Sequence, residues 1–241
     1  MILEYLEEHQ INKEYVQVLN DFETGSVTVT LNEKGAASYK IDHPKAWDKI
    51  QFTKSASDVV KHSDAFVFGS LITRDQVSKN TLYQLLEFGN YNVFDVNLRK
   101  PFYDKDVLIQ LMEKADFIKF NDEELYEIAA FLGSNFNNLE QNMHFISEKT
   151  NTKHICVTKG EHGAVLLYNN QLFYNSGYKI TVADTVGSGD SFLGSLISKL
   201  IKGENPQKAI NFACAVGALV ASKSGANPII SNEEIQRFIN P

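Results

Sequence analysis

Cysteine is scarce in this chain of 241 residues, and its two copies, Cys156 and Cys214, lie far apart in apolar surroundings. This scarcity disfavours a disulfide-stapled scaffold, and we expect two reduced core thiols, which suit a cytoplasmic protein. The six histidines show no spacing typical of metal ligands. His162 stands beside a glycine turn, and we expect it to be exposed.

Positive charge is also in short supply, with 23 Lys and Arg against 30 Asp and Glu and a formal net charge of −7. That balance argues against nucleic acid or an anionic membrane as the main partner. Apolar runs long enough to span a bilayer are lacking, and we expect no secretory signal, so a soluble protein is predicted. The 43% hydrophobic content can bury one sizeable core, and we predict a single domain over residues 1–241.

Short apolar runs alternate with helical patterns from residue 64 onward. Strand then helix, repeated along a chain, is typical of a mainly parallel central sheet with helices on both faces, and we predict this α/β fold. Ligand sites in such sheets lie beyond the carboxyl ends of the strands. The predicted strands are 65–69, 92–96, 116–120, 154–158 and a hairpin of 163–168 with 171–174, and the predicted helices are 73–88, 104–114, 122–132 and 139–149.

The chain before residue 64 follows other patterns. Apolar residues of the segment 2–6 form a helix face that begins without a capping residue, and we expect that something upstream is missing. Residues 24–41 alternate apolar and polar side chains around a turn at 32–35, which predicts a β-hairpin with one apolar face. We interpret the hairpin at 24–41 as a lid over a site or as a dimer contact, since edge strands need covering.

The segment Asp184–Phe192 (DTVGSGDSF) combines a tight glycine turn with the start of an amphipathic helix that ends near Gly203. Two glycines around a small serine leave backbone N–H groups bare at a helix N-terminus, which is an anion-binding geometry. The carboxylate of Asp190 in this turn suits phosphoryl transfer, as the base that takes a proton from an attacking hydroxyl. The alternative is a solvent-exposed helix start in which Asp190 only complements the helix dipole. No Lys followed by Ser or Thr comes after the glycines, so the turn is not a Walker A loop.

The same segment resembles the C-terminal signature of the ribokinase-like (PfkB) family of sugar kinases, usually DTxGAGDxF, with Ser188 at the alanine position. The resemblance implies that Gly187, Ser188 and Gly189 form an anion hole and that Asp190 is the catalytic base. It also implies ATP and Mg²⁺ as cofactors, with a monovalent cation as a further candidate.

Asp95, Asn97 and Arg99 stand at the end of the predicted strand 92–96. On chemistry alone, a buried Asp95 could simply pair with Arg99 and hold the loop. The sequence DVNLR also resembles the DxNxR element of fructokinase-like members of the family. The resemblance implies that Asn97 and Arg99 face the sugar and the transferring phosphate, a task that suits the planar guanidinium group.

Asn121 and Glu124 follow the predicted strand 116–120. Asn121 could cap the next helix, with Glu124 and its acidic neighbours favouring the helix dipole. The pair also resembles the family's NxxE motif, which implies that both residues hold Mg²⁺ through water. Hard oxygen ligands and retained waters suit that ion.

The segment 158–163 (TKGEHG) is by itself an ordinary glycine turn, but it resembles the family's TxGxxG loop. The resemblance implies that Thr158, Gly160 and Gly163 approach the nucleotide. A further helix begins at Asn205-Pro206 and carries a face of small residues, which predicts close helix packing. In the family this helix and the segment after it flank the adenine, which implies nucleotide-binding roles for Cys214 and Gly225.

Together with the segments WDKI and GSLITR, these elements look most similar to bacterial fructokinases. The resemblance implies an ATP-dependent carbohydrate kinase that converts fructose to fructose 6-phosphate, with sugar and ATP as partners. The apolar face of the hairpin at 24–41 needs covering, and pairing of two hairpins in a homodimer is one way to cover it. Alternatives are another kinase of the family, acting on ribose, 2-keto-3-deoxygluconate or a nucleoside, and a truncated nucleotide-binding remnant without catalysis. The family's first strand and its Gly-Gly substrate motif are expected to be missing.

Overall fold

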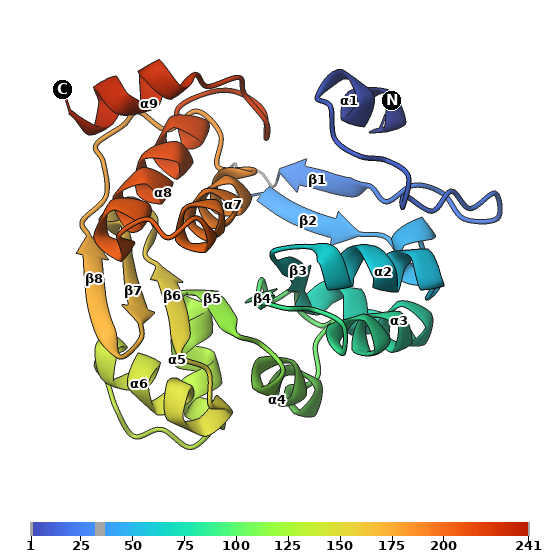
Figure 1. Cartoon of the computed structure of the whole chain (residues 1–241), viewed down its shortest axis with the longest axis horizontal. Helices are drawn as coiled ribbons and strands as arrows, with labels where there is room; N and C mark the ends of the chain where they lie inside the picture. The colour runs from blue at the N-terminus through green and yellow to red at the C-terminus, as the bar shows by residue number, and fades with distance from the viewer. Residues whose placement is uncertain (1, 32–36, 241) are drawn as a thin grey trace. The chain divides into compact units, whose positions relative to one another are not determined.

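The computed structural model describes residues 2–31 and 37–240 of the chain (Figure 1). Their packing divides the chain into two compact units. The first unit comprises Met1–Phe66, Leu71–Asn90 and Lys100–Tyr103, and the second comprises Val67–Ser70, Tyr91–Arg99 and Asp104–Pro241.

The first unit contains the predicted hairpin. Strands β1 (Val27–Leu31) and β2 (Ala37–Ile41) pair antiparallel, with Val27 opposite Ile41 and Val29 opposite Tyr39. The predicted turn at 32–35 lies outside the described residues. The helical elements of this unit are α1 (Ile2–Glu8), η1 (Ala46–Lys49), α2 (Lys54–His62), η2 (Ser70–Arg74, whose first residue belongs to the second unit) and α3 (Gln76–Leu86). Helix α1 confirms the apolar helix pattern at the start of the chain, but it buries none of its residues.

A buried ion pair joins two segments of the first unit. Arg74 Nε donates to Asp48 Oδ1 at 2.7 Å, and Arg74 Nη2 donates to Asp48 Oδ2 at 2.8 Å. Nη2 also donates to the carbonyl oxygen of Asp42 at 2.7 Å, and the guanidinium stacks 4.0 Å from the ring centroid of Trp47. Such a two-pronged contact has strict geometry. It explains why the segments WDKI and GSLITR occur together, since one supplies Trp47 and Asp48 and the other supplies Arg74.

The second unit is built on a six-stranded sheet in which the strands follow their order in the sequence. Its strands are β3 (Phe66–Gly69), β4 (Asn92–Asp95), β5 (Phe117–Asn121), β6 (His154–Thr158), β7 (Ala164–Tyr168) and β8 (Gln171–Asn175). The β4–β5 and β5–β6 pairs are parallel, whereas β6–β7 and β7–β8 are antiparallel. The predicted α/β sheet is thus confirmed, and the predicted hairpin of β7 and β8 extends it at one edge.

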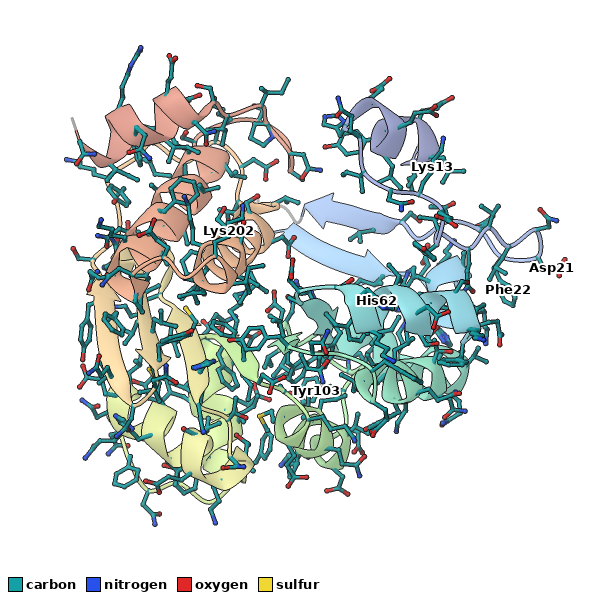
Figure 2. All side chains as sticks on the ribbon, in the orientation of Figure 1. Lys13, Asp21, Phe22, His62, Tyr103 and Lys202 are labelled. Carbon is teal, nitrogen blue, oxygen red and sulfur yellow. The ribbon has the colours of Figure 1, made fainter. Side chains whose placement is uncertain are left out.

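Helices cover this sheet and account for the long apolar runs of its strands. The helices of this unit are α4 (Lys105–Glu113), α5 (Asp122–Phe131), α6 (Leu139–Thr150), α7 (Ser188–Ile201), α8 (Pro206–Ala221) and α9 (Asn232–Ile239), of which α9 packs on α8. Consecutive strand residues such as Phe117 and Ile118 are fully buried, although neighbouring side chains point to opposite faces. Both faces of the central strands are therefore packed, as the side chains between strands and helices illustrate (Figure 2).

Local capping signals set the boundaries between α7 and α8. The Asn205 side chain accepts hydrogen bonds from the N–H groups of Gln207 and Lys208 at 3.0 and 3.3 Å, and Pro206 occupies the first helical position. Helix α7 ends at Ile201, and Gly203 follows with φ +74. Both boundaries agree with the sequence prediction, because they depend on residues within one helical turn.

Candidate functional site

The candidate site lies at the carboxyl ends of β4, β5 and β6. These three strands run parallel, so their ends meet at one edge of the sheet. In the strand register Asp95 stands opposite Lys119, and Asn121 stands opposite Thr158. Three of the sequence-predicted site segments are therefore brought together by strand pairing alone.

The glycine turn at 187–190 forms the N-terminus of α7 within the same unit. Gly187 is the N-cap residue with φ +79 and provides no side-chain cap. A Cβ atom at Gly187 would lie 2.2 Å from the carbonyl oxygen of Ala226, so only glycine fits here. The Ser188 N–H donates to Thr185 O at 3.3 Å and the Ser191 N–H donates to Gly187 O at 2.9 Å.

Between these bonds, two N–H groups of the turn are left open. The structure gives the N–H groups of Gly189 and Asp190 no acceptor among residues 2–31 and 37–240. The positive end of the helix dipole points the same way as these donors. The predicted anion site depends on such open donors at a helix N-terminus, and Asp190 lies exposed beside them.

A second carboxylate, that of Asp184, accepts two backbone hydrogen bonds next to the turn. Asp184 Oδ1 accepts from the N–H of Val186 at 3.0 Å, and Asp184 Oδ2 accepts from the N–H of Gly225 at 3.3 Å. The side chain thus joins the turn before α7 to the segment after α8. This contact explains the place of aspartate at the head of the DTVGSGD motif.

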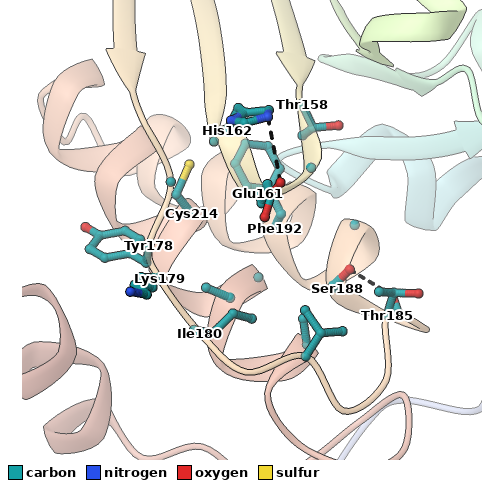
Figure 3. Close-up of a pocket in the computed structure, with 18 of the residues that line it drawn as sticks. Thr158, Glu161, His162, Tyr178, Lys179, Ile180, Thr185, Ser188, Phe192 and Cys214 are labelled. Carbon is teal, nitrogen blue, oxygen red and sulfur yellow. Dashed lines mark hydrogen bonds and ion pairs between the residues drawn. The ribbon is translucent and has the colours of Figure 1, made fainter.

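A pocket of about 700 Å³ adjoins the glycine turn (Figure 3). It is lined by six residues that the sequence analysis assigned to phosphate or nucleotide binding: Thr158, Gly160, Gly163, Ser188, Gly189 and Cys214. Gly187, Asp190 and Gly225 do not line this pocket, and neither do Asn97 and Arg99. Four of the five predicted nucleotide-binding residues therefore line one cavity, whereas Gly225 and the predicted sugar-binding residues do not.

Sequence reasoning missed the apolar wall of the pocket. Tyr178, Ile180 and Val182 come from the irregular segment after β8, and Phe192 comes from α7. Figure 3 shows Tyr178 and Ile180 on this segment, with Cys214 behind it on α8. The small residues of α8 give the remaining wall, with Gly217, Ala218 and Ala221. The segment after β8 has no regular hydrophobic period, so its pattern could not identify it.

The loop 158–163 reaches the pocket because its last glycine permits a close approach. Gly163 has φ +75, and a Cβ atom there would lie 2.1 Å from the carbonyl oxygen of Asn175. The Lys159 N–H donates to Gly163 O at 2.8 Å and closes the loop on itself. The Thr158 hydroxyl donates to Phe120 O at 3.3 Å, which ties the loop to β5.

Asp95 does pair with a cation, but the partner is Lys119 and not Arg99. Lys119 Nζ donates to Asp95 Oδ1 at 3.0 Å and to Asp95 Oδ2 at 3.3 Å. Arg99 Nη1 instead donates to the carbonyl oxygen of Leu98 at 2.9 Å. The suggested Asp95–Arg99 pair is therefore wrong, because strand pairing sets Lys119 directly opposite Asp95. Burial raises the pKa of Asp95, and the charge of Lys119 opposes that rise.

Asn121 and Glu124 form a reciprocal capping box at the start of α5. Asn121 Oδ1 accepts from the Glu124 N–H at 2.8 Å, and Glu124 Oε2 accepts from the Asn121 N–H at 2.8 Å. The second oxygen, Oε1, accepts from the N–H of Leu98 at 2.8 Å. Glu124 thus links α5 to the loop that carries Asn97 and Arg99. Burial raises the pKa of Glu124, while the two backbone N–H groups act in the opposite direction.

Both cysteines are buried free thiols, as the sequence predicts. Burial raises the pKa of Cys214 to about 12 and that of Cys156 well above its usual range. Cys214 therefore contributes apolar surface to the pocket and no nucleophile. The His162 side chain is 77% exposed, which also agrees with the prediction. In the part of the chain that the structure describes, no group of three His, Cys, Asp or Glu side chains could hold a metal ion.

The fold and the site together define an α/β protein with a candidate anion site at the carboxyl edge of its sheet. Residues 1–233 match the family described as pfkB family carbohydrate kinase. The chain belongs to this family.

Individual relatives agree with this family. The chain is 24% identical over 251 residues to probable fructokinase-6, chloroplastic, of Arabidopsis thaliana, covering 97% of this chain and 64% of the relative. It is 27% identical over 249 residues to fructokinase-2 of Oryza sativa subsp. japonica, covering 95% of this chain and 72% of the relative. The chain thus spans less than two thirds of the first relative's length.

The same fold occurs in solved structures. One is the fructokinase from Vibrio cholerae O395 in its fructose, ADP and calcium ion bound form, with a TM-score of 0.81 and 21% sequence identity. The match covers 99% of this chain and 80% of that structure.

Within the described residues, no helix combines the length and apolar character needed to cross a bilayer.

The link between Glu124 and Leu98 yields the first testable prediction. In Glu124→Gln a single carbonyl oxygen replaces two carboxylate oxygens, so the N–H of Leu98 or of Asn121 loses its acceptor. We expect the free energy of unfolding, measured by urea titration, to fall by about 1–3 kcal/mol. Glu123→Gln, an exposed change in the same helical turn, is the control and should stay within about 0.5 kcal/mol of wild type. Equal stability of the two variants would contradict this role of Glu124.

Proposed function

We propose that this protein is an ATP-dependent sugar kinase that converts fructose to fructose 6-phosphate. The observation that carries the proposal is the open N-terminus of α7, where the Gly189 and Asp190 N–H groups have no acceptor among the described residues and Gly189 lines a pocket of about 700 Å³. Membership of the pfkB carbohydrate kinase family supports the reaction class. The names of the Arabidopsis and rice relatives support fructose as the acceptor.

The pocket would bind the nucleotide. Its volume suits a ligand of nucleotide size, and its walls from the segment 178–182 and from α8 are mainly apolar, as a flat base requires. Residues of the loop 158–163 line the same pocket, as do Ser188 and Gly189 of the turn. Backbone N–H groups of the turn would bind the phosphates without a charged side chain.

The chemical step needs a base and a fixed acceptor. Asp190 would accept the proton of the attacking sugar hydroxyl, whose oxygen then bonds to the γ-phosphorus of ATP. The bond from that phosphorus to the bridging oxygen breaks, and ADP leaves. The open N–H groups of the turn would stabilise the charge on the transferring group, so that positioning and electrostatics supply most of the rate.

Magnesium would bind near Asn121 and Glu124 through its water shell. The Glu124 oxygens already accept backbone N–H groups at 2.8 Å, which fits waters better than direct ligation. Mg²⁺ usually keeps several waters when it bridges substrate phosphates, and it would neutralise phosphate charge here. A monovalent cation remains a further candidate for the same phosphate-binding region.

Asn97 and Arg99 would orient the sugar and the transferring phosphate. Asn97 has φ +39, and its carbonyl oxygen accepts from the Ser70 hydroxyl at 3.5 Å, so the loop has a defined path after β4. Arg99 is suited to phosphate because its planar fork remains charged. The role of the β1–β2 hairpin as a lid or dimer contact, and a cytoplasmic location, remain predictions.

A substrate panel tests the proposed acceptor. With ATP and Mg²⁺, we expect fructose to give a kcat/KM roughly tenfold or more above that of ribose, adenosine and 2-keto-3-deoxygluconate, measured by coupled release of ADP. Discrimination of this size is ordinary when a site hydrogen-bonds the hydroxyls of its substrate. Preference for another acceptor would refute fructose while leaving a kinase. Turnover of none of the four would favour a nucleotide-binding remnant.

Asp190 can be tested against the simpler role of a helix-start charge. We expect Asp190→Asn to lower kcat by at least roughly a hundredfold, the usual scale for a positioned base, with little change in ATP binding. Asp122→Asn is the matched control, since Asp122 is a half-buried carboxylate in the first turn of α5. If both variants retain similar turnover, Asp190 only complements the dipole of α7.

A further inference from the structure

Lys119 is a buried cation in the middle of the candidate site. It lies on β5, is 8% exposed, and faces Asp95 on the neighbouring strand. Lysine is rarely buried in a sheet unless its ammonium has partners, because desolvation of the charge is costly. The ammonium of Lys119 therefore needs hydrogen-bond acceptors within the site.

Asp95 does not use all the donors of this ammonium. A lysine ammonium has three N–H donors. Within the described part of the chain, it donates to the two oxygens of Asp95 at 3.0 and 3.3 Å. At least one donor of a side chain that is only 10% exposed thus remains for another acceptor.

The ammonium lies directly beside the glycine turn. A Cβ atom placed on Gly189 would lie 3.6 Å from Lys119 Nζ. Gly189 in turn lines the pocket and carries one of the open N–H groups of α7. The unused donor of Lys119 and the open donors of the turn therefore belong to the same small region.

Apart from Lys119, the charged groups considered in this region are carboxyl groups. Asp95, Glu124 and Asp190 are three carboxyl groups, and the charge of Asp190 helps to raise the pKa of Asp95. Lys119 acts in the opposite direction on the pKa of both Asp95 and Glu124. A phosphoryl group entering the turn would meet these carboxylates, so it needs a nearby cation to offset them.

We propose that Lys119 donates a charge-assisted hydrogen bond to the γ-phosphoryl group of the bound nucleotide, and that Asp95 holds the lysine in position for it. This inference rests on the proposed kinase function. It adds to the glycine turn a buried cation from the adjacent strand, so the phosphoryl group would be bound by backbone N–H groups on one side and an ammonium on the other.

A solely structural ion pair would behave differently from a phosphate-binding lysine. If Lys119 only stabilised β4 and β5, its removal would weaken the binding of every nucleotide to the same extent. If it binds the γ-phosphoryl group, its removal should weaken binding of a triphosphate more than of a diphosphate. The ratio of the two affinities thus separates the two roles.

The experiment compares AMP-PNP and ADP by calorimetry in the presence of Mg²⁺, using the full chain. We expect Lys119→Met to lower the affinity for AMP-PNP relative to ADP by at least about tenfold, as loss of one hydrogen bond to a charged group predicts. Turnover of fructose should fall as well. Lys202→Met, at an exposed lysine just after α7 (Figure 2), is the control and should leave the ratio unchanged.

A double variant guards against misfolding, because Lys119→Met leaves Asp95 buried without its partner. Asp95→Asn combined with Lys119→Met removes both charges, and the relative loss of AMP-PNP binding should persist in it. Recovery of the wild-type ratio in the double variant would overturn the proposal, and so would an equal loss for both ligands. If the wild-type chain binds nucleotide and phosphorylates fructose, but the ratio of AMP-PNP to ADP affinity is the same in the wild type and the Lys119 variants, only the role of Lys119 is refuted. A wild-type chain that binds neither nucleotide refutes the kinase function and this inference with it.

Discussion

Two buried carboxylates, Asp95 and Glu124, hold the carboxyl ends of β4 and β5 in one arrangement. Asp95 binds the ammonium of Lys119 across the strand pair, and Glu124 accepts the N–H groups of Leu98 and Asn121. Asp95 therefore joins β4 to β5 through Lys119, and Glu124 joins the loop after β4 to the end of β5. Burial raises the pKa of both carboxyl groups, and the ammonium and the N–H donors counteract that rise.

The hydrogen bonds of Asp95 and Glu124 form a polar frame, and the other parts of the site lie next to this frame. The loop 96–99 and the start of α5 keep their spacing through Glu124, and the glycine turn of α7 lies beside Lys119. A frame of charged hydrogen bonds is more demanding than apolar packing, since removing one partner leaves a buried charge unpaired. The benefit is a fixed electrostatic environment at the place where the proposed phosphoryl transfer occurs.

Features that depend on neighbouring residues were predictable from the sequence. Strand β6 begins at His154 and ends at Thr158 as predicted, and Asn205 and Gly203 delimit their helices, because a cap acts within one turn. Helices α2 and α9 were not predicted. Both are short, with nine and eight residues, although each begins at an N-cap residue, Thr53 or Ser231, and ends with at least one basic residue in its last turn.

Features that depend on strand register were harder to predict from the sequence. The convergence of Thr158, Ser188 and Cys214 on one pocket followed from their motifs, but the partner of Asp95 did not. Choosing Lys119 over Arg99 requires knowing that β4 and β5 pair in parallel with Asp95 opposite Lys119. The link from Glu124 to Leu98 likewise spans 26 positions in the sequence, so no local pattern reveals it.

The central claim is that the N-terminus of α7 and the loop 158–163 bind the phosphates of a nucleotide. Hydrogen–deuterium exchange of this chain with and without AMP-PNP and Mg²⁺ tests it directly, because amides that donate to a ligand exchange more slowly. We predict slower exchange in peptides covering residues 158–163 and 184–192, with the strongest effect at Gly189 and Asp190. Unchanged exchange in both segments, with protection only elsewhere in the chain, would contradict the claim.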